Sequence, residues 1–157
     1  MRLLFRQRFF SWFDSYDIYD EAGNTVYIVE GKLSWGHRLE IYDAAHNHLG
    51  TVKEEVLTFL PRFALYQGEA YIGAIRKEFS LFTPRFTLDC QGWQVAGNFM
   101  QWDYTVTDAG GGFIMSASKE LFHLTDTYVI DVPDPGNALL ALMIVLAIDA
   151  AKCSGGS

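Results

Sequence analysis

The sequence predicts a mainly β fold: a roughly twelve-stranded closed antiparallel β-barrel that encloses a central hydrophobic C-terminal α-helix. Three observations predict it. A strand–turn–strand pattern recurs along most of the 157 residues, glycines recur in one phase of the predicted strands, and an apolar segment follows the last strand. A chain of this length is the size of one domain and can bury a core of its own.

The repeated pattern is an alternating apolar run, a turn rich in Gly, Asn or Asp, and a second alternating run. Alternation with period two, broken by such turns, is typical of β-hairpins. The first runs lie at residues 16–20, 39–43, 63–66, 86–89 and 104–108, and the returning runs at 25–30, 50–55, 70–79, 93–99 and 113–119. A stretch at 2–10 precedes them and a last strand at 128–132 follows. So many strands at hairpin spacing predict a meander that curls into a barrel.

One phase of this alternation is expected to point into the barrel. It contains Tyr16, Ile18, Leu39, Ile41, Phe63, Leu65, Phe86, Leu88, Trp93, Val95, Tyr104, Val106, Tyr128 and Ile130. Gly31, Gly50, Gly73 and Gly97 share the phase on the returning strands. Glycine weakens a strand and often marks a bulge or the close approach of another backbone. A helix inside the barrel would supply that approach.

The C-terminal segment is predicted to be this helix, over about residues 135–150. Asp134 is placed to cap it and Pro135 to occupy its first position. Residues 138–148 are apolar on every side, which is typical of a buried helix. The rival interpretation, a membrane span, needs about 20 apolar residues, so a transmembrane helix is not expected. The prediction is one domain over 1–152, followed by a short flexible tail at 153–157.

The charge and the termini restrict the possible partners and the compartment. A net charge of −7 argues against a general nucleic-acid binder, whereas a local basic patch can still act at a membrane. Cys90 and Cys153 show no metal-ligand spacing and are expected to be free thiols in a reducing compartment; a disulfide between them is the alternative, which nothing in the predicted fold requires. The N-terminal residues lack an apolar run long enough for a signal peptide. We therefore expect a cytoplasmic protein, peripheral to the membrane if it meets one.

Three segments resemble a known family. The segment Tyr16–Asn24, its echo Leu39–Asp43 and the ending Leu142–Ala150 are similar to the LURP-one-related family. This resemblance implies a fold like that of the tubby C-terminal domain, a twelve-stranded barrel threaded by a C-terminal helix, which phospholipid scramblases are expected to share. It also implies recognition of anionic phospholipid headgroups by basic residues on the outer wall of the barrel. None of the tubby basic residues is matched to a position in this chain.

Two groups of basic residues are candidates for such a site. Arg2, Arg6 and Arg8 share one phase of the N-terminal strand and can hold a headgroup phosphate, although a solvated outer face is the simpler interpretation. Arg62, Arg76, Lys77 and Arg85 lie near strand ends in the middle hairpins. They can extend an anion site or pair with Glu54, Glu55, Glu69 and Glu78, and local neutralisation is favoured.

Other polar groups offer weaker sites. His46 and His48 lie in a predicted turn without a third ligand, which favours surface histidines over a metal site. Residues 110–112 are all glycine and indicate a hairpin turn. Asp103, Asp108, Asp126 and Asp131 fall at strand starts and turns, where aspartate caps its own backbone. Asp149 can line the barrel mouth or pair with Lys152, an N-terminal arginine or a backbone amide.

No catalytic motif or cofactor site accompanies this fold, so we expect a protein that is not an enzyme. The function we predict is a binding module for anionic phospholipid headgroups or a membrane-associated partner. The alternative is a cytoplasmic protein-interaction or regulatory protein without a small ligand. A barrel filled by its own helix would place either site on the outer wall or at a rim.

Overall fold

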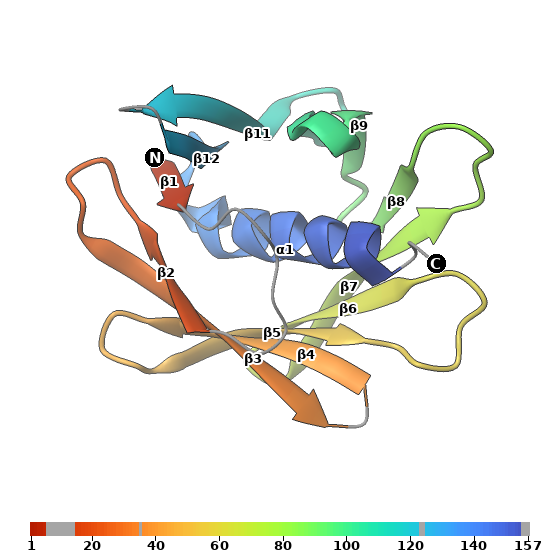
Figure 1. Ribbon diagram of the computed structural model, residues 1–157, viewed down its shortest axis with the longest axis horizontal. Helices are drawn as coiled ribbons and strands as arrows, with labels where there is room; N and C mark the ends of the chain where they lie inside the picture. The colour runs from red at the N-terminus through yellow and green to blue at the C-terminus, as the bar shows by residue number, and fades with distance from the viewer. Residues whose placement is uncertain (6–14, 35, 123–124, 155–157) are drawn as a thin grey trace.

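The computed structural model describes residues 1–5, 15–34, 36–122 and 125–154, and within them the chain forms twelve strands, two 3₁₀ turns and one α-helix (Figure 1). The strands are β1 (Arg2–Phe5), β2 (Ser15–Tyr19), β3 (Thr25–Ser34), β4 (Gly36–Asp43), β5 (His48–Glu54), β6 (Arg62–Gln67), β7 (Ala70–Glu78), β8 (Arg85–Asp89), β9 (Gln94–Asn98), β10 (Asp103–Thr107), β11 (Phe113–Phe122) and β12 (Thr125–Asp131). The 3₁₀ turns are η1 (Phe99–Gln101) and η2 (Pro135–Asn137), and the helix is α1 (Ala138–Ser154). The predicted fold class is therefore confirmed.

All twelve strands belong to one antiparallel sheet in the order β8-β7-β6-β5-β4-β3-β2-β1-β12-β11-β10-β9. The two ends of the chain meet in this sheet, because β1 pairs with β12 from Arg2 opposite Asp131 to Phe5 opposite Tyr128. The barrel is nearly closed. Its ladder is interrupted between β8 and β9, the two strands that end the order. The predicted strand at residues 2–10 is seen as far as Phe5, and the remainder lies outside the described residues.

Aspartates that end the repeated pattern hold three of the hairpin turns. In each turn one carboxylate oxygen accepts the N–H groups two and four residues further on. Asp20 accepts from Ala22 and Asn24, Asp43 from Ala45 and Asn47, and Asp108 from Gly110 and Gly112, at 2.7–3.0 Å. Aspartate favours turns for this reason. The expectation that residues 110–112 form a hairpin turn is confirmed.

Helix α1 passes through the interior of the barrel (Figure 1). Asp134 caps the preceding turn η2, since its carboxylate accepts the N–H of Gly136 at 2.9 Å, and Pro135 follows at the first position. Within the helix, residues 140–148 are all buried, and Leu142 and Ile144 have no exposed surface. The residues 135–152 would suffice to cross a membrane by length and composition alone, but 67% of this stretch is buried inside the protein.

The helix boundaries differ slightly from the prediction. Residues 135–137 form a 3₁₀ turn instead of the first α-helical turn, and the α-helix continues to Ser154. Part of the predicted flexible tail is therefore helical. No glycine or proline precedes Gly155 at this end of the helix, which agrees with a helix that continues past Lys152.

Gly50 shows why one strand needs a glycine beside the helix. A Cβ atom there would lie 3.1 Å from the Met143 sulfur of α1 and 2.7 Å from the Tyr66 carbonyl oxygen. Gly73 and Gly97 have a different reason, because a Cβ at either would strike the backbone of the neighbouring strand, at Asp89 or Asp103. The expected approach of the helix is thus confirmed at Gly50, whereas these two glycines accommodate strand neighbours.

Replacement of Gly50 by alanine is expected to destabilise the protein by about 1–3 kcal/mol, because an overpacked interior must shift backbone or side chains. Urea unfolding at neutral pH measures the change. Gly110→Ala is the matched control: the added Cβ would lie 3.5 Å from the nearest atom, an ordinary contact, and the change should stay within about 0.5 kcal/mol. Equal stability of the two variants would contradict the close approach of α1 to β5.

Candidate functional site

Of the predicted arginine site, the structure describes Arg2. Its guanidinium lies 2.7 Å from a carboxylate oxygen of Glu120 in β11 and 4.0 Å from Glu21. These carboxylates neutralise Arg2, so it offers no free charge to a ligand. Arg6 and Arg8 lie outside the described residues. The three-arginine site therefore remains a prediction, and its described member favours the simpler interpretation of an outer-wall residue.

The second basic group divides into paired and unpaired members. Arg62 binds the Glu55 carboxylate and donates to the Tyr71 hydroxyl at 3.0 Å, while Arg76 lies 3.6 Å from Glu78. Local neutralisation, as predicted, holds for these two arginines. Lys77 and Arg85 differ, because neither forms an ion pair with another described residue.

Next to these cations the barrel carries an exposed apolar surface. The β5–β6 connection (residues 55–61) and the β7–β8 connection (79–84) project from the same end of the barrel, on the right of Figure 1. Pro61 accepts the N–H of Lys77 at 2.9 Å, which joins the bases of the two loops. Their apolar side chains, which we call the apolar end, are Val56 (40% exposed), Leu57 (92%), Phe59 (97%), Phe79 (72%), Leu81 (77%) and Phe82 (94%).

Hydrogen bonds hold the base of the β5–β6 connection. The Glu55 N–H donates to the Arg62 carbonyl at 2.9 Å, and the Thr58 hydroxyl donates to the Glu55 carbonyl at 3.1 Å. These hydrogen bonds hold the base of the loop, while Leu57 and Phe59 are exposed. A groove of about 370 Å³ lies beside this loop, with Lys53 and Leu57 among its lining residues. Lys53 has no ion pair within the described chain.

The sequence pattern did not single out the apolar end. A signal existed, because residues 56–60 and 79–82 are mostly apolar although they lie between predicted strands, where polar turn residues are expected. Single exposed apolar residues are normal on proteins, whereas a contiguous group marks an interaction surface. This is the feature of the described chain that most resembles a binding site.

A second hollow lies between the two strands that end the ladder. Its volume is about 660 Å³, and it is lined by residues 82–86 and 95–101, which include Arg85, Phe86, Gly97 and Phe99. The rings of Phe86 and Phe99 meet edge to face, 4.9 Å apart. Both phenylalanines are buried, so the hollow reaches down to the hydrophobic core.

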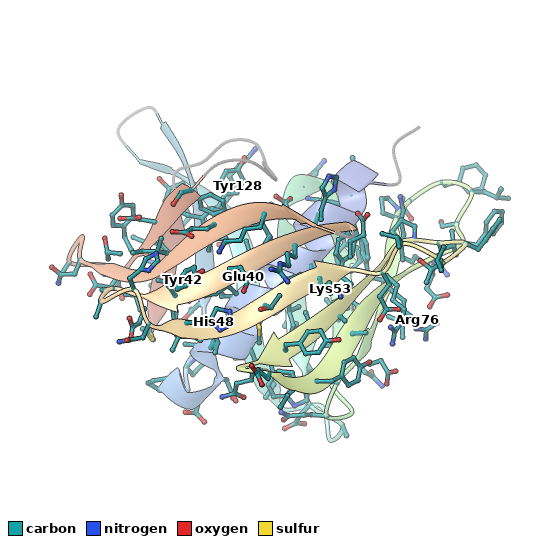
Figure 2. All side chains as sticks on the ribbon, turned by 90° about the horizontal axis from the view of Figure 1, so that it is seen from below. Glu40, Tyr42, His48, Lys53, Arg76 and Tyr128 are labelled. Atoms are coloured by element: carbon teal, nitrogen blue, oxygen red, sulfur yellow. The ribbon has the colours of Figure 1, made fainter. Side chains whose placement is uncertain are left out.

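The outer wall carries a polar cluster around Glu40 (Figure 2). This buried carboxylate lies 2.5 Å from His48, 2.7 Å from the Thr51 hydroxyl and 3.0 Å from Arg38. His46 pairs with Glu30 at 2.8 Å. The predicted turn histidines therefore contact carboxylates on separate strands, and they do not come together as a ligand pair.

Asp149 lies where α1 meets η1, and its partner is Lys152. The carboxylate–ammonium distance is 3.2 Å, and the ammonium also donates to the Phe99 carbonyl at 2.9 Å and lies over the Trp102 ring. Among the alternatives for Asp149, the pairing with Lys152 is confirmed. Burial raises the pKa of the Asp149 carboxyl, and Lys152 only partly offsets this. The hollow beside the pair has a volume of about 140 Å³, too small for a typical ligand.

This raised pKa predicts how stability depends on pH. A carboxyl whose pKa is higher in the folded protein stabilises it fully below the unfolded pKa of about 3.8, and the contribution is lost as pH rises through the folded pKa. Asp149→Asn should therefore match the wild type near pH 3.5 and become relatively more stable as pH rises to 7. Urea unfolding of both proteins across this range measures the difference. If the stability of Asp149→Asn relative to the wild type fell as pH rises, the raised pKa of Asp149 would be contradicted.

Cys90 precedes the two-residue turn between β8 and β9. It is a buried free thiol, and burial followed by the Asp89 charge raises its pKa. A thiol with a raised pKa is a poor nucleophile. The side chain of Cys153 lies outside the described residues.

A nearly closed antiparallel barrel around its own C-terminal helix defines the class of protein. The comparisons with known proteins agree with this geometry. The profile of the LURP-one-related family matches residues 1–149, and the chain belongs to this family. An uncharacterised protein of Bacillus subtilis, YxjI, is 25% identical over 150 residues, which cover 95% of this chain and 92% of that protein.

A solved structure supports the fold. The X-ray structure of an Arabidopsis thaliana protein, AT5G01750, aligns with a TM-score of 0.64 over 95% of this chain and 90% of the plant protein. The two sequences are 13% identical, so the likeness concerns the fold alone.

Proposed function

We propose that this LURP-one-related protein is a non-enzymatic, cytoplasmic binding module that docks reversibly on membranes carrying anionic headgroups. The apolar end is the part that meets the membrane. The single observation that carries the proposal is the concentration of six exposed apolar side chains on two adjacent loops, flanked by cations that form no ion pair with another described residue.

The chemistry of the apolar end suits a lipid interface. Leucine and phenylalanine side chains enter the boundary between headgroups and acyl chains, and full burial of each is worth about 1.5–3 kcal/mol. Lys53 precedes the first loop, and Lys77 and Arg85 flank the second. Each basic residue near an anionic surface adds about 1 kcal/mol. Together, apolar burial and electrostatic attraction support membrane binding that is measurable and reversible.

The net charge of −7 acts against this attraction. Salt screens the repulsion from charges that lie more than about one Debye length from the membrane, whereas the two lysines and the arginine lie beside the apolar end and act at contact. We therefore expect the apolar side chains to provide most of the affinity and the cations to provide the preference for anionic lipid. Added salt should weaken binding without abolishing it.

Vesicle flotation tests the proposal. The protein is mixed at low salt with vesicles of phosphatidylcholine alone, or with phosphatidylglycerol, cardiolipin or phosphoinositides added. We expect recovery in the floating fraction with the anionic mixtures and less with phosphatidylcholine alone. Absence from the floating fraction with every anionic mixture would exclude the membrane function.

The alternative is a protein-interaction module that uses the same surface. An exposed apolar patch also marks protein interfaces, and Glu54, Glu55 and Glu78 near the loop bases add negative charge that a membrane would not favour. This alternative predicts no flotation. It also predicts that the loop variants described below lose a stoichiometric protein partner in place of vesicles.

A further inference from the structure

The turn between β8 and β9 has the backbone conformation of a turn that joins two paired strands. Gln91 and Gly92 both have positive φ values, 56° and 73°, and the Trp93 N–H donates to the Cys90 carbonyl at 3.0 Å. This is the two-residue turn that normally closes a β-hairpin, because its twist matches that of paired strands. Counting outward from it, a regular hairpin would place Phe86 opposite Gly97 and Arg85 opposite Asn98.

Those residues do not pair. Strands β8 and β9 are the two ends of the twelve-stranded ladder, and they have no hydrogen-bonded register with each other. Residues 84–86 and 97–99 instead line opposite walls of the 660 Å³ groove. The hairpin is thus closed at its turn and open at its other end. Within the part of the chain that the structure describes, each strand bonds one neighbour, so alternate backbone groups along its second edge lack a strand partner there.

We propose that this groove binds an extended peptide as an added β-strand, and that its ligand pairs antiparallel with β9 and carries an acidic side chain opposite Arg85. Strand addition to an exposed edge is a general mode of peptide recognition, in which backbone hydrogen bonds give affinity and pockets for alternate side chains give specificity. The occupant is an acidic, alternately apolar segment of a partner protein.

The wall formed by β9 suits the close approach of a backbone. Ala96 and Gly97 have little or no side chain, and both are exposed. Small exposed residues leave room for another backbone along this strand. The floor is apolar, because the buried Phe86 and Phe99 rings close it, so every second side chain of the added strand would meet these rings.

The charge of the groove selects an acidic peptide. Arg85 is the one charged residue among the described residues that line it. The cross-strand neighbour of Arg85 in β7 is Glu78, but this carboxylate contacts Arg76 at 3.6 Å and the Thr87 hydroxyl at 2.5 Å. Arg85 is therefore available to a ligand carboxylate, and the groove volume lies within the range of about 300–1,000 Å³ usual for ligand sites.

The test uses the full-length protein in solution, without vesicles. The probes are a set of short peptides that are acetylated at the N-terminus and amidated at the C-terminus. Every second residue is valine. Each peptide carries one glutamate, which occupies a different one of the remaining positions in each member of the set. Binding is followed by fluorescence polarisation and by shifts of the backbone amide signals of residues 94–98. We expect at least one peptide to bind and to shift these signals. Failure of the whole set to bind at millimolar concentration would overturn the proposal.

Two modified probes examine the mode of binding. In a strand, alternate backbone N–H groups point to opposite edges, so methylation of every second nitrogen removes the donors along one edge. Two such peptides can be made, one methylated at the odd positions and one at the even positions. The peptide that has lost the donors facing β9 should bind at least about tenfold more weakly. Equal affinity of both methylated peptides would mean side-chain contacts alone and would overturn strand addition. If decyl phosphate shifts the signals of residues 94–98 and the peptides do not, the groove is a lipid site and the proposal is wrong.

Two protein variants complete the test. The affinity of Arg85→Glu for the glutamate peptide should fall about tenfold, and the variant should bind the matched peptide with lysine in place of glutamate. A variant whose fold is damaged would bind neither peptide. Ala96→Trp should fill the groove and abolish binding with little change in urea unfolding, because Ala96 is exposed. Unchanged binding by both variants would place the peptide elsewhere on the protein.

Discussion

Leu142→Asp is expected to abolish folding rather than to weaken any binding activity. Leu142 has no exposed surface and lies in the middle of α1, among residues that are all buried. An ionised carboxylate there would be forced into the core without a partner. The cost includes the lost packing of a leucine, about 2–5 kcal/mol, and the penalty for a buried polar group, several kcal/mol more. The sum is comparable with the whole stability of an ordinary domain, about 5–15 kcal/mol.

Circular dichroism and urea unfolding of the purified variant measure this outcome, and Ile144→Asp should behave in the same way. Leu57→Asp is the matched control, because it makes the same chemical change at a residue that is 92% exposed. That variant should fold with a stability within about 0.5 kcal/mol of the wild type. A Leu142→Asp protein with native strand content and cooperative unfolding would disprove the central position of the helix.

The largest functional effect is expected from aspartates in the apolar end. Leu57→Asp and Phe82→Asp, each alone, should reduce vesicle binding at least about tenfold, because each removes about 1.5–3 kcal/mol of apolar burial and adds a negative charge. The double variant should not float with anionic vesicles at any ordinary lipid concentration. Both residues are more than 90% exposed, so folding should not change.

Phe113→Asp serves as the control for these loop variants. Phe113 is 50% exposed and begins β11 at the β10–β11 hairpin, outside both loops. Its replacement makes the same change in charge and a similar change in apolar surface. Vesicle binding by this variant should stay within about a factor of five of the wild type, because one added charge is worth about 1 kcal/mol or less near the surface. An equal loss of vesicle binding in Phe113→Asp and Leu57→Asp would contradict a special role of the apolar end in membrane binding.

The sequence predicted the fold well because the signals for it are local. Asp20, Asp43 and Asp108 end the repeated pattern, and each fixes its turn through its own carboxylate. The all-round apolar composition of residues 138–148 requires a buried helix wherever the chain places it. The helix ends were less predictable, since Cys153 and Ser154 carry neither a strong stop signal nor an apolar face.

The candidate sites were less predictable because exposure is a property of the tertiary structure. Leu57 and Phe59 have the composition of core residues, and only the arrangement of β5, β6 and β7 leaves them uncovered. The β8–β9 groove is hidden for a similar reason. The turn at Gln91 and Gly92 predicts a closed hairpin, whereas in the folded chain β8 and β9 are the two ends of the ladder.

The arginine prediction shows the same limit. Alternation placed Arg2 on an outer face, but not beside Glu120, which lies 118 residues further along the chain. The ion pair follows from the pairing of β1 and β11 with the same strand, β12. A long-range partner of this kind cannot be seen from spacing, and it changes Arg2 from a free cation into a neutralised one.

The most direct test of membrane docking is the environment of one labelled loop residue. Phe59→Cys, in a protein with Cys90→Ser and Cys153→Ser, carries a polarity-sensitive NBD fluorophore, and Phe113→Cys in the same background is the reference. With phosphatidylglycerol vesicles, the label at 59 should shift to shorter emission wavelengths and be quenched by nitroxides on the lipid chains, and the label at 113 should stay in water. An unshifted label at 59 on protein that floats with the vesicles would contradict docking through the apolar end.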